Sequence, residues 1–274
     1  MPAQSKMSVR RWQDWPLAIR KKIPLLPPEE LKKLVLEGKL TPKKLGTWCT
    51  GTGGVEKGGD KMFGPALQCK CAADTWGPAR QFQELNAPSE HCFKNNKGYL
   101  HPHVQENACA KPGDDHGPCC VPGKLDIMVG GFPCTPFSPA NERRFKDDPW
   151  SHPDAQVLVD ILQCLEQDDP EGLPDGVILE NVFGMMKSSP KHRADAMAPY
   201  EVVRAKLDAL THFAWSHIVL NGSFWTPGEK KRLYFALVQR RKGGQAAVDR
   251  IIKSTEGVHC GKEIQPGSIQ FDMV

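Results

Sequence analysis

From Leu45 onward, short apolar runs alternate along the chain with amphipathic stretches. This alternation is typical of βα units, in which helices join parallel strands and cover the sheet. We therefore expect an α/β fold with a doubly wound, Rossmann-like, mostly parallel sheet. The last two runs leave no room for a helix between them, so we expect that strand pair to be antiparallel. The predicted strands are residues 45–49, 68–73, 125–130, 176–181, 214–221 and 232–239.

The chain divides into an extension, a main domain and a tail. Residues 1–44 are basic and punctuated by proline, and they contain one predicted helix, PPEELKKLVLEGK, with acids early and lysines later. The main domain spans residues 45–242, and residues 243–274 form the C-terminal tail. Within the domain, apolar residues at three- and four-residue spacing predict helices over 154–167 and 198–212.

The composition excludes several classes of protein. No apolar run approaches membrane-spanning length, and the polar start MPAQSKMSVRRWQDW has no signal-peptide core. We expect an intracellular protein without membrane association, whose 10 cysteines are reduced. A net charge of +4 permits a polyanionic partner without requiring one, because a basic patch matters more than the total.

An insertion rich in Cys, His, Gly and Pro interrupts the alternation at residues 89–122. Two interpretations are open, a zinc site or an irregular loop. The spacing matches no standard zinc finger and CC is not CxxC, so we favour the loop and predict no metal. The candidate zinc ligands are Cys92, His101, His103, Cys109, His116, Cys119 and Cys120.

A glycine-rich turn, WCTGTGGVE, follows the first predicted strand and should open a helix. Gly51, Gly53 and Gly54 allow a tight turn and a close approach of the backbone to a ligand at the helix start. An ordinary βα turn explains the same glycines.

Asp74 ends the next predicted strand, in CAADTWGPARQF. A doubly wound fold offers a carboxylate at this position to ribose hydroxyls, and Trp76 could pack on an adenine face. Asp74 could equally be a helix N-cap, and the two roles are compatible.

A third segment, DIMVGGFPCTPFSP, runs an apolar strand into two glycines and places Cys134 between two prolines. A buried structural cysteine needs no such scaffold, because free cysteine packs almost anywhere in a core. We interpret Cys134 as a thiol presented at a strand end, placed to attack a group in the crevice above the sheet.

The fourth segment, DGVILENVFGM, ends a strand with Glu180 and Asn181 after an apolar run that would bury the strand. An acid followed directly by an amide at such a strand end favours a functional site over a solvated surface charge.

These segments together resemble the carbon-5 cytosine methyltransferase family. The catalytic loop of that family, approximately GGPPCQxFS, is similar to GGFPCTPFS here, and its ENV motif is intact at residues 180–182. Its glycine motif, roughly DxFxGxGG, resembles TWCTGTGG, with Thr47 in place of the acid and Cys49 in place of phenylalanine. Its QxRxR segment resembles TPGEKKRLYFALV, in which Arg232 keeps the second arginine.

The resemblance implies methyl transfer from S-adenosylmethionine to carbon 5 of a flipped cytosine. Cys134 would add to carbon 6, Glu180 would neutralise the ring nitrogen, and Arg232 would hold the exocyclic oxygen. The expected cofactor-binding residues are Gly51, Gly53, Gly54, Asp74, Trp76 and Pro133. The expected substrate contacts are Asn181, Lys230 and Ser138.

The sequence alone does not decide the class of substrate. The resemblance implies DNA as the partner, with transfer RNA as the alternative in one branch of the family, and a homologue that binds without turnover as a third interpretation. In a eukaryote it implies a nuclear protein. About three dozen residues follow Val238, and they contain no recognisable target-recognition region. We therefore expect a partner subunit that supplies recognition, a compact enzyme of low specificity, or a larger gene product.

Overall fold

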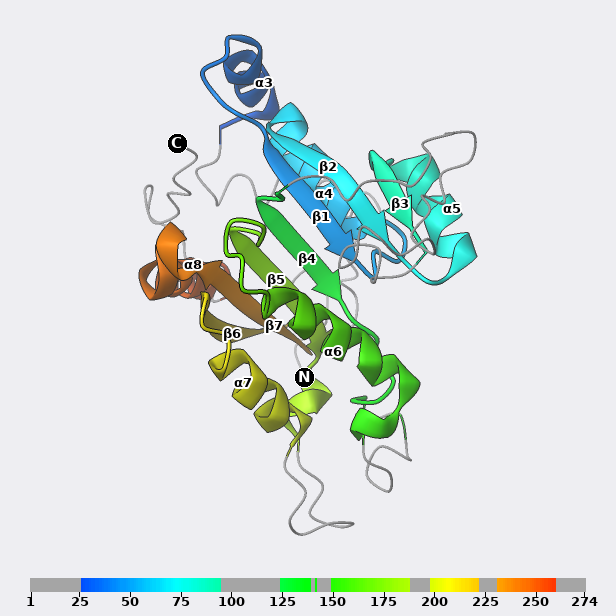
Figure 1. Cartoon of the computed structure of the whole chain (residues 1–274). Coiled ribbons are helices and arrows are strands. Elements are labelled where there is room, and N and C mark those ends of the chain that lie inside the picture. The colour runs from blue at the N-terminus through cyan, green and yellow to red at the C-terminus, as the bar shows by residue number, and fades with distance from the viewer. Residues whose placement is uncertain are drawn as a thin grey trace, which may run out of the picture.

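A seven-stranded sheet forms the centre of the protein in a computed structural model of the chain (Figure 1). The structure describes residues 26–94, 124–138, 141, 149–187, 198–221 and 231–259. The strands lie in the order β3-β2-β1-β4-β5-β7-β6. Their bounds are β1 Lys43–Trp48, β2 Leu67–Ala73, β3 His91–Phe93, β4 Ile127–Gly131, β5 Gly176–Val182, β6 Phe213–Asn221 and β7 Lys231–Gln239.

The strand pairing confirms the predicted α/β class. Strands β1 to β5 pair in parallel, whereas β7 is antiparallel to both β5 and β6, as expected for the last pair. The chain winds outward from β1 through β2 to β3, and then returns to place β4 on the other side of β1. The carboxyl ends of β1 and β4 therefore form the topological switch point, where doubly wound sheets bind ligands.

Helices cover both faces of the sheet. On one face, α6 (Pro153–Leu165) and α7 (Pro199–Asp208) lie across the strands (Figure 1). On the other face, α4 (Gly54–Phe63) packs near Leu45 and Leu67, and Val248 of α8 (Gly244–His259) packs on Ala214 and Val238. The described residues also form the helices α3 (Pro28–Leu36) and α5 (Gly77–Asn86) and the 3-10 turns η1 (Gly64–Ala66), η5 (Pro149–Ser151), η6 (Phe183–Met186) and η8 (Arg240–Lys242).

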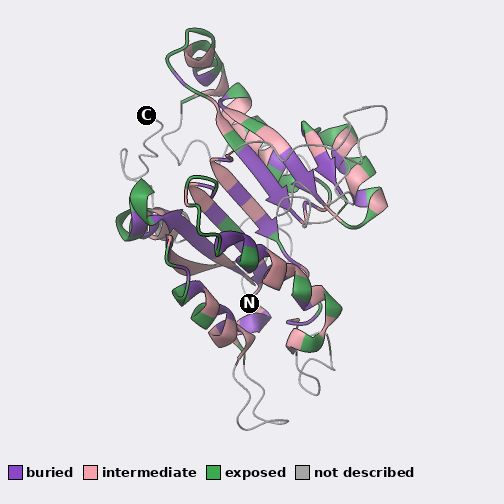
Figure 2. Ribbon diagram, in the orientation of Figure 1, coloured by how far each residue is buried: buried purple, intermediate pink, exposed green. Residues whose placement is uncertain are grey.

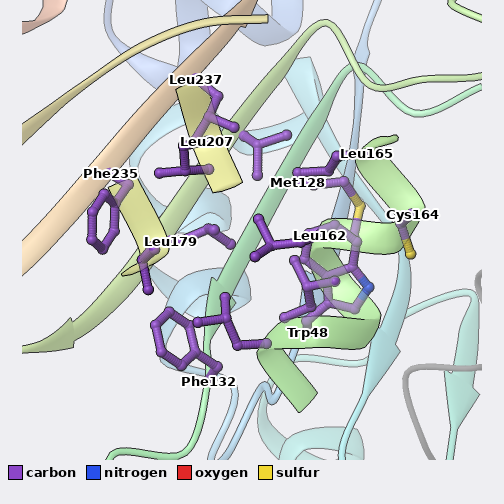
Figure 3. Close-up of a cluster of buried hydrophobic side chains, with 14 of the residues drawn as sticks. Trp48, Met128, Phe132, Leu162, Cys164, Leu165, Leu179, Leu207, Phe235 and Leu237 are labelled. Atoms are coloured by element: carbon purple, nitrogen blue, oxygen red, sulfur yellow. The ribbon is translucent and has the colours of Figure 1, made fainter. Parts of the chain in front are cut away.

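The largest core cluster lies between the sheet and α6 and α7. Leu162 and Leu165 of α6 pack there with Trp48 and Met128 of the sheet, while Leu207 of α7 lies among side chains of β5 and β7 (Figure 3). Figure 2 shows that buried residues run along the central strands and that exposed residues lie on the outer sides of the helices. This packing fixes the strand ends from which the site residues project.

Two elements were not expected from the sequence. Strand β3 spans only three residues at the start of the predicted insertion 89–122, which is too short for an alternation to be visible. Helix α8 lies in the predicted tail, and its apolar residues, including Val248 and Ile252, recur at helical spacing on the side that faces the sheet. The boundaries 1–44, 45–242 and 243–274 themselves stay a prediction.

The candidate zinc ligands of the insertion, for which we favoured an irregular loop, lie mostly outside the described residues. Cys92 is described, and its side chain is buried in β3. Among the residues that the structure does describe, no group of three His, Cys, Asp or Glu side chains could hold a metal ion. No helix in those same parts of the chain is long and apolar enough to cross a membrane.

We expect His217 of β6 to make stability depend on pH. Its ring nitrogen lies 3.1 Å from the hydroxyl of Tyr200 on α7. Burial, helped by the positive charge of Arg204, lowers the pKa of His217, so the folded protein favours the neutral ring. The unfolded chain binds a proton more readily, so we expect stability to fall as the pH drops below 6.5, the ordinary pKa of histidine.

Urea unfolding at pH 7.5 and pH 5.5 checks this expectation. His217→Gln keeps a hydrogen-bonding group beside Tyr200 but does not titrate, so it should lose less stability than the wild type between the two pH values. An equal loss in both proteins would show that His217 is not the group responsible.

Candidate active site

The glycine-rich turn between β1 and α4 has the conformation that its glycines allow. Gly51 and Gly53 have positive φ values of 57° and 73°, which favour glycine. Cys49 also has a positive φ, 52°, which is uncommon for a residue with a side chain and marks a constrained backbone. The turn therefore brings main-chain N–H groups to the carboxyl end of β1, at the start of α4.

Asp74 holds this turn from the end of β2. Its Oδ2 accepts a hydrogen bond from the N–H of Gly51 at 2.8 Å, and its Oδ1 accepts from the N–H of Trp76 at 2.8 Å. Each carboxylate oxygen has a second lone pair for a ligand donor. Trp76, two residues after Asp74, is 64% exposed. Asp74 thus links the two loops, while α5 begins after Trp76 and has no side-chain N-cap bond.

In the loop after β4, Cys134 is exposed to solvent while aromatic residues on both sides of it are buried. Phe132 and Phe137 are both buried, and their rings meet edge to face with centroids 5.9 Å apart. Between them the carbonyl of Cys134 accepts hydrogen bonds from the N–H groups of Phe137, at 2.9 Å, and Ser138, at 2.8 Å. The Cys134 residue itself is exposed. Two aromatic anchors and a tight turn therefore hold this thiol at the tip of the loop.

Glu180 and Arg232 form an ion pair at the neighbouring strand ends. Arg232 Nε lies 2.7 Å from Glu180 Oε1, and both side chains are about one-third exposed. The pairing of β5 with β7 explains the contact, because Val182 is opposite Arg232 and alternate residues of a strand share a face. Burial raises the pKa of Glu180 even though the nearby guanidinium of Arg232 opposes the shift. The Glu180 carboxyl group is therefore easier to protonate than an exposed carboxyl group.

The two glycines of the catalytic-loop motif make room for neighbouring side chains. Gly131 is the parallel partner of Glu180, and a Cβ atom at Gly131 would lie 3.4 Å from Glu180 Oε2. A Cβ atom at Gly130 would lie 3.2 Å from the ring of Trp48. The end of β4, three residues before Cys134, therefore lies directly beside the carboxyl group of Glu180.

Asn181 has a different role from the substrate contact that we predicted. It is 1% exposed, its amide Nδ2 donates to the carbonyl of Phe132 at 2.9 Å, and its Oδ1 accepts from the N–H of Val182 at 2.8 Å. Its side chain points to the face opposite that of Glu180, because successive residues of a strand alternate. Asn181 therefore ties the cysteine loop to β5, and we do not assign it to the substrate.

The other predicted site residues lie at the same edge of the sheet or outside the described residues. Pro133 is half-buried next to Cys134, and Ser138 is half-buried at the end of the loop turn. Gly54 is the first residue of α4. Lys230 lies outside the described residues.

Two residues that the sequence did not single out belong to this region. Tyr234 is the cross-strand partner of Glu180, and its pKa is raised by burial and by the charge of Glu180. Position 234 shares a strand face with Arg232, so strand alternation could have identified it. Glu56 of α4 is buried and accepts hydrogen bonds from Thr47 and Thr50. No spacing in the sequence predicted this contact.

We expect Asn181→Ala to destabilise the protein by about 1–3 kcal/mol, because the Phe132 carbonyl would lose its buried donor. Urea unfolding measures the change. Asn86→Ala is the matched control, since Asn86 donates to the Phe82 carbonyl at 2.7 Å in an exposed position and should matter little. Equal effects of the two substitutions would contradict the role given to Asn181.

Comparison with known proteins identifies the family. The model of the C-5 cytosine-specific DNA methylase family matches residues 51–244. The Neisseria gonorrhoeae protein named Type II methyltransferase M.NgoBV is 28% identical over 111 residues, which cover 40% of this chain and 24% of that protein. Type II methyltransferase M.AquIA of Picosynechococcus sp. is 29% identical over 115 residues, which cover 41% of this chain and 43% of that protein.

Among solved structures, a DNMT2 variant from Spodoptera frugiperda matches with a TM-score of 0.47 and 20% identity, covering 72% of this chain and 50% of that chain. The S. pombe Dnmt2 methyltransferase matches with a TM-score of 0.47 and 18% identity, covering 72% of this chain and 51% of that chain. The matched region thus spans less than half of those curated relatives, and about half of those solved chains.

The family match includes the glycine turn, the Cys134 loop, the ENV strand end and Arg232, which the fold gathers around the carboxyl edge of one sheet. Since it covers more than half of the chain, the protein belongs to the family of C-5 cytosine-specific DNA methylases.

Proposed function

We propose that the protein transfers a methyl group from S-adenosylmethionine to carbon 5 of cytosine in DNA, through a covalent adduct with Cys134. The observation that carries the proposal is the juxtaposition of two strand ends. The exposed Cys134 follows β4, and its neighbour β5 ends in the Glu180 carboxyl group paired with Arg232.

The first step is nucleophilic. Carbon 5 of cytosine is a poor nucleophile, and addition of the Cys134 thiolate to carbon 6 turns the ring into an enamine. The new S–C6 bond shifts the ring electrons toward carbon 5, and nitrogen 3 takes up a proton. An exposed thiol on a loop stiffened by Pro133 and Pro136 can reach a ring from one side without moving the sheet.

Glu180 and Arg232 act at the opposite side of the ring. The raised pKa of Glu180 makes it easier for this carboxyl group to take up a proton and share it with nitrogen 3, so charge that develops on the ring is neutralised where it forms. Arg232 fixes the carboxyl group through Nε, and its remaining N–H groups can hold the exocyclic oxygen. A base then removes the proton from carbon 5, and the Cys134 thiolate leaves as the double bond returns.

The cofactor supplies an electrophilic methyl group on a sulfonium centre. The residues around the switch point suit this molecule. Asp74 has lone pairs left for ribose hydroxyls, the exposed Trp76 offers a face for adenine, and Gly51, Gly53 and Gly54 let the backbone approach the amino-acid part. Pro133 would close the side next to Cys134.

The target base must leave the duplex, because a thiol at a loop tip cannot reach carbon 6 inside a base stack. DNA is the proposed substrate since the matched family is described as DNA methylases. Arg232 and Lys231, at the carboxyl edge of the sheet, would favour the phosphate backbone nearby.

A methyl-transfer assay tests the proposal. The protein is incubated with methyl-labelled S-adenosylmethionine and either cytosine-rich duplex DNA or unmodified transfer RNA, and the nucleosides are identified by mass spectrometry. We expect labelled 5-methyldeoxycytidine from the DNA. Label in the transfer RNA alone would move the substrate class to RNA, and label in neither would overturn the proposal.

A further inference from the structure

Glu56 is a buried carboxylate underneath the glycine turn. It is the third residue of α4 and is 4% exposed. Its Oε1 accepts hydrogen bonds from the hydroxyl of Thr47, at 2.5 Å, and from the hydroxyl of Thr50. Thr47 lies in β1 and Thr50 begins the turn, so a single oxygen atom connects the strand, the turn and the helix.

Helix capping does not explain this residue. An acid at the third helical position commonly reaches back to the N–H of the N-cap residue. Here the N-cap is Gly53, and its N–H donates to the carbonyl of Thr50 at 3.1 Å. Glu56 Oε2 is buried and has no hydrogen-bond partner within the described parts of the chain. An incompletely satisfied buried carboxylate lowers stability, which favours a functional reason for its presence.

The charges around the glycine turn suggest a functional reason for a buried carboxylate at position 56. The first turn of α4 carries the positive end of the helix dipole, which attracts anions and disfavours a cationic ligand. The carboxylate of Glu56 lies in that same turn and opposes this potential. Burial, and then the charge of Glu56, raises the pKa of the Cys69 thiol on β2.

We propose that Glu56 is a positioning residue of the cofactor site, which holds the turn through Thr47 and Thr50 and whose negative charge favours a cationic methyl donor over its neutral product. This inference rests on the proposed function. Asp74 and Glu56 hold the turn from two sides, since Gly51 is bonded to Asp74 and the preceding Thr50 to Glu56. S-adenosylmethionine carries a sulfonium, whereas S-adenosylhomocysteine carries a neutral thioether in its place. A nearby negative charge therefore distinguishes the two.

Isothermal titration of both molecules into the wild type and Glu56→Gln tests this inference. Glutamine keeps an oxygen for the two threonines and removes the charge. We expect the affinity for S-adenosylmethionine to fall about tenfold, the scale of one charge at a partly buried helix end, and that for S-adenosylhomocysteine to change less than about twofold. The melting temperature should stay the same or rise. An equal loss for both ligands, or no loss, would overturn the inference.

Three further variants distinguish an effect of the Glu56 charge from a loosening of the turn. Asp60→Asn removes the same charge from an exposed position on α4 and should leave both affinities unchanged. Thr50→Val loosens the turn but keeps the charge of Glu56, so it should lower the affinities for both ligands by the same factor. If Glu56→Gln does not fold, Glu56→Asp withdraws the carboxylate by one methylene and should lower the affinity ratio in the same direction, and an unchanged ratio would refute the proposal. A wild type that binds neither ligand would contradict the proposed function, independently of Glu56.

Discussion

Replacing Cys134 with alanine should reduce methyl transfer by at least about 10³-fold, because the enamine cannot form without the sulfur nucleophile. The exposed position of Cys134 means that the substitution creates no cavity, so the melting temperature should stay close to that of the wild type. Turnover is measured with labelled cofactor at saturating DNA. Binding of S-adenosylmethionine should be retained, since the glycine turn and Asp74 are unchanged.

Cys164→Ala is the matched control for this prediction. Cys164 lies in α6, and burial raises the pKa of its thiol. It has the same side chain in a core position, so its replacement should cost some stability and leave turnover largely intact. If Cys134→Ala kept more than a tenth of the wild-type activity, Cys134 would not be the nucleophile.

The second large effect is expected for Glu180→Gln, which should lower turnover by about 10²–10³-fold because an amide cannot deliver a proton to nitrogen 3. The raised pKa gives the sign of the pH dependence. The protonated carboxyl group is favoured in the folded protein, so the stability associated with it is present at low pH and is lost as the pH rises through the folded pKa. Turnover that depends on this proton should fall over the same range.

Glutamine carries no charge, so Glu180→Gln also removes the loss of stability that ionisation of the Glu180 carboxyl group causes at high pH. We therefore expect Glu180→Gln to melt at the same temperature as the wild type at pH 8, or higher, while its turnover is lost. Glu171→Gln is the control, because Glu171 also pairs with an arginine, Arg241, but at an exposed position. A Glu180→Gln protein with near-normal turnover would contradict the role of this carboxyl group.

The strands that carry the site were predictable because their apolar runs are long and end in distinctive residues. The run before Glu180 and the Gly-Gly-Phe-Pro-Cys sequence place two reactive side chains at strand ends, and the structure puts those ends side by side. The βα alternation predicted a doubly wound, mostly parallel sheet, but it did not specify the order of the strands.

Asn181 shows where reasoning from a motif alone was insufficient. Adjacent strand residues point to opposite faces, so the Asn181 amide is buried against the cysteine loop, whereas Glu180 pairs with Arg232 on the other face. The contact of Glu56 with Thr47 and Thr50 could not be predicted, because a side-chain rotamer at the start of a helix depends on how that helix packs against the sheet. β3, at three residues, was too short for any periodic pattern.

The most direct test of the central claim is the covalent capture of DNA that carries 5-fluorocytosine. Fluorine at carbon 5 cannot leave as a proton does, so an adduct that has received the methyl group cannot eliminate the cysteine. The account predicts a protein–DNA species that resists denaturation, requires S-adenosylmethionine, is absent with Cys134→Ala, and yields a modified peptide containing Cys134. A protein that methylates cytosine without forming this species, or that forms it through another cysteine, would contradict the account.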